Sequence, residues 1–346
     1  MRLSTAVNYT GSPRTVARKA ADLERAGIEI IWVPEAYGFD GPTLMGYLAA
    51  LTDRVQIGSS ILNVFSRTPA ALAQTAAGLD HLSEGRAILG LGASGPQVIE
   101  GFHGVPFDRP LGRTRAVVDV VRQALRREPL SASGIFELPL TADGGGTGFG
   151  KPLKMISHPH RSTVPIFLAA LGPANVRLAA EIADGWVPFL YLPEHAPTVW
   201  GQSLADGASL RASDLGPLEV VAGGRLQVCN SEDEVRAALE AVRPRLALYV
   251  GGMGAQGTNF YFDLVSRYGY EAAAHEIQEH FLAHRVTEAE RAVPLELLTL
   301  TNLVGTEGYI RDRIAAYRDS GVTILNVDVH DPDPRRLVSA VAEWAS

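Results

Sequence analysis

Residues 83–92 read Ser-Glu-Gly-Arg-Ala-Ile-Leu-Gly-Leu-Gly, the end of a helical run followed at once by a short apolar strand. Gly85 stands where a helix C-terminus needs the left-handed conformation that glycine adopts at little cost. The same junction recurs at residues 25–33, 183–190 and 319–329. Helix–glycine–strand junctions from one end of the chain to the other predict alternating α and β elements, hence a parallel sheet. The functional site is then expected at the C-terminal ends of the strands.

Eight apolar segments are predicted to be strands, at residues 3–9, 28–33, 55–62, 87–92, 165–171, 186–190, 219–228 and 323–329. Most of them are near-continuous apolar runs, which is typical of strands covered on both faces or closed into a barrel. Helical segments lie between them, at residues 13–26, 42–51, 69–82, 111–127 and 173–182. Eight strands that alternate with helices over this length predict an α/β fold, a (β/α)8 TIM barrel.

Two regions depart from this alternation. Residues 131–163 are rich in glycine and have no helical period, which indicates an irregular excursion with a short hairpin and a loop. Residues 232–303 contain more helix than one strand–helix unit needs. No segment resembles a flexible linker, so we expect residues 1–346 to form one domain with these two insertions. The excursion and residues 249–270 are expected to form the wall of the substrate pocket.

Composition narrows the possible partners. The chain has 346 residues and a formal net charge of −7, with 46% hydrophobic and 20% charged residues. An acidic balance argues against a surface for nucleic acid or anionic membranes. No apolar run approaches the roughly 18 residues of a membrane span, and no signal-peptide pattern is present. Cys229 is the only cysteine, so no internal disulfide can form. We expect a cytoplasmic protein, and the spacing of His, Asp and Glu predicts no metal site.

Residues 90–95 follow a predicted strand and satisfy the pattern G-x-G-x-x-G. Backbone N–H groups in such a turn can hold a phosphate, and a helix N-terminus adds positive partial charge. A dinucleotide-binding fold has this pattern after its first strand, with an acidic residue about 20 positions further on. Here the pattern follows the fourth strand, and neither Asp108 nor Asp119 is suitably placed. A phosphate turn is therefore favoured, with a glycine turn that holds no ligand as the alternative.

A second candidate turn covers residues 169–175, which read Ala-Ala-Leu-Gly-Pro-Ala-Asn. Small residues end a strand, and a helix opens at Pro173 with its first N–H groups free to meet an anion. Ordinary helix capping is the alternative for this turn alone. Two anion-binding turns on strand ends of one barrel indicate a ligand with a phosphate and an extended tail.

The third predicted strand has an unusual composition. Residues 56–63 read Gln-Ile-Gly-Ser-Ser-Ile-Leu-Asn, with small polar residues inside an otherwise apolar run. Such residues leave a gap or indicate a bulge. A flat ring can lie against a bulge of this kind.

These motifs together resemble the luciferase-like monooxygenase superfamily, and more narrowly its branch that uses the deazaflavin coenzyme F420, as methylenetetrahydromethanopterin reductase does. The motifs that carry the resemblance lie at residues 58–62, 67–69, 83–92, 95–101, 109–111, 150–154, 183–186, 305–307 and 319–322. The resemblance implies a (β/α)8 barrel with the coenzyme in the mouth at the C-terminal ends of the strands. A deazaflavin carries carbon where flavin has the nitrogen that supports radical chemistry, so it moves a hydride and reacts poorly with oxygen.

The resemblance also implies which residues bind the coenzyme. It places a non-proline cis peptide bond at Ser60-Ile61, bulging against the back face of the ring, and a hydrogen bond from Asn63 to the ring edge. Two further groups would meet the ring, the phosphate or the tail: Ala93, Ser94 and Gly95 after the fourth strand, and Leu171, Gly172, Ala174 and Asn175 after the fifth. Lys151 and Lys154 would pair with an acidic tail, or else be solvated loop lysines.

The residues that would handle a proton differ from those of related dehydrogenases. Where the resemblance implies an Asp-His pair after the second strand, this chain has Glu35-Ala36. Glu35 is the first candidate for the proton-handling group, with Tyr37 on the same loop. The alternative is that Glu35 only binds the backbone or an arginine. His81 and His103 are also expected near the mouth, although a lone histidine is more often structural.

The sequence thus predicts an F420-dependent oxidoreductase that transfers a hydride between the deazaflavin and a small organic substrate with a C=C, C=N or C=O bond. Two alternatives remain open: an FMN-dependent monooxygenase of the same superfamily, and a non-catalytic deazaflavin-binding protein. The family resemblance also implies a homodimer.

Overall fold

The chain folds into a closed parallel barrel, described by a computed structural model for residues 1–7, 12–254 and 257–346. Eight strands form the barrel, all paired in parallel: β1 (Arg2–Ala6), β2 (Ile30–Val33), β3 (Gln56–Ser59), β5 (Ala87–Gly92), β6 (Ile166–Ala169), β7 (Gly185–Val187), β8 (Glu219–Val228) and β10 (Ile324–Val329). The barrel closes because β10 pairs with both β8 and β1. The predicted (β/α)8 TIM barrel is confirmed.

The observed strand bounds agree with the predicted ones for some strands and differ for others. β5 and β8 have the predicted bounds. The third predicted strand is interrupted, because β3 ends at Ser59 and a short β4 (Leu62–Asn63) resumes the pairing with β5. A further short strand, β9 (Leu303–Gly305), pairs with the end of β8 and was not predicted. Residues 8 and 9 of the first predicted strand lie outside the described residues.

Helices surround the barrel, and most begin at a proline or after a polar side chain that caps the first turn. The helices that lie between successive barrel strands, or after the last strand, are α1 (Pro13–Glu24), α2 (Gly41–Leu51), α3 (Pro69–Leu82), α4 (Pro96–Gly101), α5 (Pro110–Leu125), α6 (Pro173–Ile182), α7 (Ala196–Ala208), α14 (Glu307–Asp319) and α15 (Pro334–Trp344). Within the described residues, no helix has the length and apolar character that a membrane span requires.

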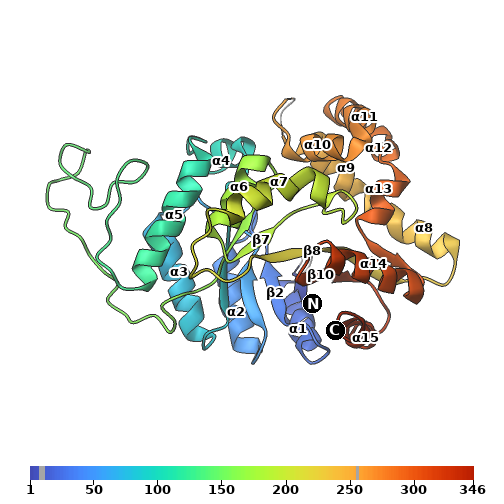
Figure 1. Cartoon of the computed structure of the whole chain (residues 1–346), viewed down its shortest axis with the longest axis horizontal. Helices are drawn as coiled ribbons and strands as arrows, with labels where there is room; N and C mark the ends of the chain where they lie inside the picture. The colour runs from blue at the N-terminus through green and yellow to red at the C-terminus, as the bar shows by residue number, and fades with distance from the viewer. Residues whose placement is uncertain (8–11, 255–256) are drawn as a thin grey trace.

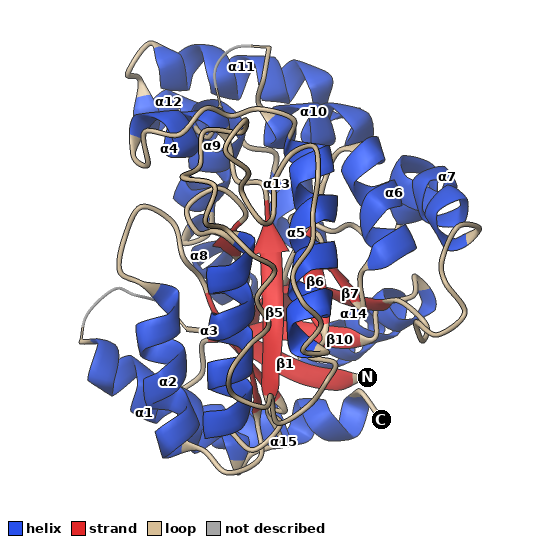
Figure 2. Cartoon of the chain, turned by 90° about the vertical axis from the view of Figure 1, so that its left-hand side faces the viewer, coloured by secondary structure: helices blue, strands red, loops and turns tan. Residues whose placement is uncertain are grey.

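The helix-rich region between β8 and β9 contains α8 (Glu232–Glu240), α9 (Arg243–Gly252), α10 (Phe260–Val265), a π-helical turn (Ser266–Tyr270), α11 (Glu271–Leu282), α12 (Val286–Arg291) and α13 (Leu295–Leu300). In Figure 2 the arrow of β5 points towards the end of the barrel where α9 to α12 lie. These helices therefore stand over the C-terminal mouth, and the expectation that residues 249–270 form part of the pocket wall stays a prediction.

The glycine-rich excursion lies elsewhere. Its residues run beside α5: Leu130 N–H donates to the Leu153 carbonyl, and the Arg113 guanidinium lies 5.0 Å from the centre of the Phe136 ring. Figure 1 shows the excursion extending outward from α5, away from α9 to α12. The expectation that it walls the pocket is therefore wrong. It packs on the flank of the barrel, and its Phe149 is 89% exposed.

The barrel interior is closed below the mouth. Six inward side chains form an apolar cluster: Ile30, Trp32, Ile88, Phe167, Val221 and Ile324. At Gly58 a Cβ would lie 2.2 Å from the Trp32 ring, so the missing side chain leaves room for that indole. At the opposite end Arg2 bonds Gln56 and Glu219, each at 2.6 Å. In the described residues, the open approach to the barrel interior lies above this core, at the C-terminal ends of the strands.

Candidate active site

The two predicted anion turns lie side by side, because β5 and β6 are neighbours and pair Leu91 with Leu168. The first turn runs through Ser94, whose backbone is left-handed with a φ of 58°, to Gly95 at the start of α4. The second places Gly172 at the start of α6. A Cβ at Gly95 or Gly172 would meet no atom within 4 Å, so open space adjoins both backbones. The predicted residues of the two turns are thus brought together at one rim.

The third predicted strand is interrupted between Ser59 and Leu62, and the peptide bond Ser60-Ile61 is cis, as the resemblance implied. The neighbouring strand fits it closely. Ser59 Oγ accepts from Gly90 N–H at 2.9 Å and donates to the Gly90 carbonyl at 2.7 Å. A Cβ at Gly90 would lie only 1.8 Å from the Ser59 carbonyl oxygen. Gly90 is therefore required for the approach of two strands rather than for binding a phosphate.

A small apolar floor lies at the same level of the mouth. At Gly92 a Cβ would lie 2.9 Å from Ile61 Cδ1 and 3.5 Å from Ala169 Cβ, so these three residues pack together. Ile61 is half-buried, as are Ala93 and Gly95 of the adjoining turn. The floor offers an apolar surface beside two turns with open space at their glycines, which is the arrangement that a flat ring with a phosphate requires.

Asn63 is buried, with 3% of its surface exposed, and its side chain is largely occupied. Its Oδ1 accepts from the backbone N–H groups of Phe65 and Ser66, at 3.0 and 2.7 Å. Its Nδ2 lies 3.3 Å from Nε2 of His103, which confirms His103 near the mouth. His81 is at the opposite end, in the last turn of α3 before β5 begins, so its expected position is wrong.

Arg267 is a candidate binding residue that the sequence did not indicate. Its Nη2 donates to the Leu171 carbonyl at 3.1 Å, which places a cation beside the second turn. Burial lowers the pKa of Arg267, partly offset by Tyr268 and Asp263. Among the described residues, none forms an ion pair with it. No local motif could reveal this contact, because 96 residues separate the two partners.

The loop lysines do not lie at the mouth. Leu153, beside Lys154, receives a hydrogen bond from Leu130, which follows the C-terminal end of α5. Lys151 and Lys154 are exposed there, at the end of α5 farther from α4 and the first turn. The structure therefore supports the alternative, solvated lysines.

Glu35 belongs to an ion cluster beside β2. Arg67 Nη1 lies 2.6 Å from Glu35 Oε1, and Arg67 Nη2 lies 2.8 Å from Oε2. Oε2 also accepts from the Gly41 N–H at the start of α2, at 2.8 Å. The hydrogen bond to Glu35 raises the pKa of Arg67. These contacts match the alternative that Glu35 binds the backbone and an arginine, and its role in proton transfer stays a prediction.

Tyr37 lies on the outer rim. Its side chain is 57% exposed, and its ring centre is 6.4 Å from that of Phe102, which is exposed as well. Its predicted catalytic role also stays a prediction.

The other side of the mouth is formed by long side chains. The rings of Phe189, after β7, and Tyr249 of α9 stack at 4.4 Å, and Tyr261 of α10 meets both edge-on. Burial raises the pKa of Tyr261 strongly. The Arg245 guanidinium lies 5.5 Å from the centre of the Phe189 ring.

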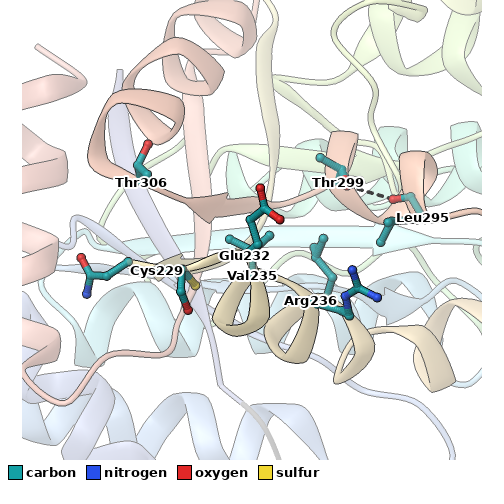
Figure 3. Close-up of a pocket in the computed structure, with 10 residues that line it drawn as sticks. Cys229, Glu232, Val235, Arg236, Leu295, Thr299 and Thr306 are labelled. Atoms are coloured by element: carbon teal, nitrogen blue, oxygen red, sulfur yellow. Dashed lines mark hydrogen bonds between the residues drawn. The ribbon is translucent and has the colours of Figure 1, made fainter.

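A separate groove of about 400 Å³ lies between α8 and α13 (Figure 3). Its lining includes Cys229, Glu232, Arg236, Leu295 and Thr306. None of the predicted coenzyme residues lines it. Across the part of the chain that the structure describes, no cluster of His, Cys, Asp and Glu could hold a metal ion.

Comparisons with known proteins agree with this architecture. The family model described as luciferase-like monooxygenase matches residues 1–323. A Mycobacterium tuberculosis protein, provisionally named a coenzyme F420-dependent oxidoreductase, is 40% identical over 345 residues, which cover 99% of both chains. The 5,10-methylenetetrahydromethanopterin reductase of Archaeoglobus fulgidus is 24% identical over 92% of this chain and 91% of its own. The solved coenzyme F420-dependent tetrahydromethanopterin reductase of Methanopyrus kandleri superposes with a TM-score of 0.79, at 22% identity, over 99% of this chain and 97% of that one. The chain belongs to the luciferase-like monooxygenase family.

Proposed function

We propose that this protein is an oxidoreductase that uses coenzyme F420 and transfers a hydride between the deazaflavin and a small organic substrate. The observation that carries the proposal is the pair of neighbouring turns with open space at Gly95 and Gly172, beside the floor of Ile61, Gly92 and Ala169. The name of the 40% identical relative supports the choice of coenzyme.

The residues at the mouth fit a phosphorylated ring. Backbone N–H groups near Ser94 and Gly95, and those at the start of α6, are suited to bind phosphate oxygens. Leu171, Ala174 and Asn175 border the same turn, and Arg267 adds a positive charge beside it. When bound, the coenzyme supplies a hydride donor carbon. The work of the chain is to hold that ring against Ser60 and Ile61 and to keep water from its back face.

Asn63 can still donate a hydrogen bond to the coenzyme from its side-chain amide. Its Oδ1 is engaged by two backbone N–H groups, so its Nδ2 is the remaining donor. One amide hydrogen faces His103 Nε2, and the second is available for the ring edge. A homodimer and a cytoplasmic location stay predictions, to be checked by sedimentation and by cell fractionation.

Coenzyme choice is tested by titrating the purified protein with F420, FMN and NADPH while following fluorescence. We expect F420 to bind more tightly than FMN, and NADPH to bind weakly. Tighter binding of FMN would contradict the proposal. Oxygen consumption during turnover separates the monooxygenase alternative, because a deazaflavin enzyme should consume none. Tight F420 binding without turnover across a broad panel of ketones, enones and imines would favour a binding protein.

A further inference from the structure

The side chain of Arg225 points into the barrel from β8, on the side opposite the apolar floor of Ile61, Gly92 and Ala169. Along β8, Val221 belongs to the inner apolar cluster, whereas Ala222 and Leu226 belong to the outer core between strands and helices. Side chains alternate along a strand, so Arg225 and Gln227 face inward. Both lie nearer the C-terminal end of the strand than Val221 does. They therefore face the mouth above the closed core.

The Arg225 guanidinium has a neutral partner. Its Nε and Nη2 donate to Gln227 Oε1, at 3.1 and 2.8 Å. Burial lowers the pKa of Arg225, and the charge of Asp328, its pairing partner on β10, opposes that shift. Among the described residues, no carboxylate forms an ion pair with Arg225, and Asp328 bonds His330 instead, at 3.0 Å. Both Nη1 hydrogens and one Nη2 hydrogen are left for a ligand.

The backbone that carries Arg225 is held firmly. Its N–H donates to Asn302 Oδ1 at 2.9 Å, and Asn302 Nδ2 donates to the Leu298 carbonyl at 2.7 Å. At Gly224 a Cβ would lie 2.3 Å from the Thr301 carbonyl oxygen, so the junction before β9 presses directly on β8. These contacts hold the backbone at Arg225, and the two bonds to Gln227 Oε1 hold its guanidinium before a substrate arrives. Donors positioned in advance are the condition for strong electrostatic stabilisation.

We propose that Arg225 binds the oxygen of the substrate's carbonyl group, so that the protein reduces ketones, aldehydes or C=C bonds conjugated with a carbonyl. The inference rests on the proposed function, because it needs a hydride donor on the facing floor. It narrows the substrate class, since imines are commonly reduced as iminium cations, which a guanidinium would repel.

The reaction balances with the proposed coenzyme as reductant. The acceptor carbon gains the hydride with its electron pair, and the π pair of the C=O or C=C–C=O group moves to the oxygen. A proton from water at the mouth then gives the alcohol, or the saturated ketone through its enol. Negative charge grows on the oxygen during hydride arrival, and this is the charge that Arg225 stabilises.

The test compares Arg225→Met, Arg225→Lys and a control, Arg236→Met, which changes an exposed arginine of the α8 groove. Benzoate serves as a stable oxyanion probe, titrated by calorimetry into protein loaded with oxidised F420. Cyclohex-2-en-1-one and 1-pyrroline serve as carbonyl and imine acceptors for reduced F420. The affinity for F420 and the melting temperature are measured for every variant.

We expect Arg225→Met to weaken benzoate binding about tenfold and to lower kcat/KM for cyclohexenone about 100-fold, with unchanged affinity for F420. Arg225→Lys should recover part of both losses, and Arg236→Met should match the wild type. Equal benzoate binding by wild type and Arg225→Met, or faster wild-type reduction of 1-pyrroline than of cyclohexenone, would overturn the inference and leave the coenzyme assignment standing. Failure of the wild type to bind F420 would overturn the proposed function, and this inference with it.

Discussion

The two sides of the mouth are built in different ways. On the β3–β6 side the surface is backbone and small residues, with Ile61, Gly92 and the two glycine turns. On the β7–β10 side the surface is made of long side chains: Arg225 from β8, and Tyr249 and Arg267 from the helix-rich region between β8 and β9. The β3–β6 side suits the coenzyme, because the coenzyme is the same molecule in every catalytic cycle. The second side can change by single substitutions, which suits the substrate.

Adding a side chain on the β3–β6 side, which is built from backbone and small residues, should destabilise the protein most. Gly90→Ala places a Cβ against the Ser59 carbonyl at 1.8 Å, a backbone contact that cannot rotate away. We expect a loss of about 3 kcal/mol in the free energy of unfolding, measured by chemical denaturation. Gly78→Ala is the control, because a Cβ there meets nothing within 4 Å on an exposed helix face. A Gly90→Ala protein as stable as the control would contradict the account of this side.

A substitution of Arg267 tests whether the β7–β10 side, which is built from long side chains, also binds the coenzyme. Arg267→Met removes a cation beside the second turn, so we expect about 50-fold weaker F420 binding by fluorescence titration, with little change in stability. Arg291→Met, on the exposed face of α12, is the matched control. Unchanged F420 affinity in Arg267→Met would confine coenzyme binding to the small-residue side.

The same contrast explains what the sequence could predict. The turns after β5 and β6 and the break near Ser60 depend on neighbouring residues, so short motifs and the family resemblance located them. Arg267 could not be found this way, because its contact with Leu171 depends on the path of an insertion. The glycine-rich excursion was misplaced for the same reason, since nothing local in residues 131–163 says which flank of the barrel it follows.

Glu35 follows β2, at the border of the β3–β6 side. A substitution there can distinguish a structural role of Glu35 from a role in proton transfer. Glu35→Gln weakens the bonds to Arg67 and Gly41, so we expect unfolding to become about 2 kcal/mol easier, with F420 affinity kept. Glu343→Gln, an exposed control, should change little. A Glu35→Gln protein with wild-type stability but no turnover would contradict the structural role and support proton transfer by Glu35.

The smallest effect concerns the pH dependence of the same cluster. Burial raises the pKa of Asp40, but hydrogen bonds from Thr43 and Arg67 outweigh burial and leave it below the ordinary value of 3.8. Asp40 therefore adds stability above pH 3.8, which is lost as the pH falls through the lowered folded-state pKa. Denaturation curves at pH 6 and pH 3 should show a smaller difference for Asp40→Asn than for the wild type. Asp312→Asn, which changes an exposed carboxylate on α14, should keep the wild-type difference, and an Asp40→Asn protein that also keeps it would contradict this assignment.

The most direct test of the central claim is a crystal structure of the protein with coenzyme F420. We predict phosphate oxygens about 3 Å from backbone N–H groups of both turns, with the ring over Ile61 and Gly92. A phosphate bound at only one turn, or a ring seated in the groove between α8 and α13, would contradict the account.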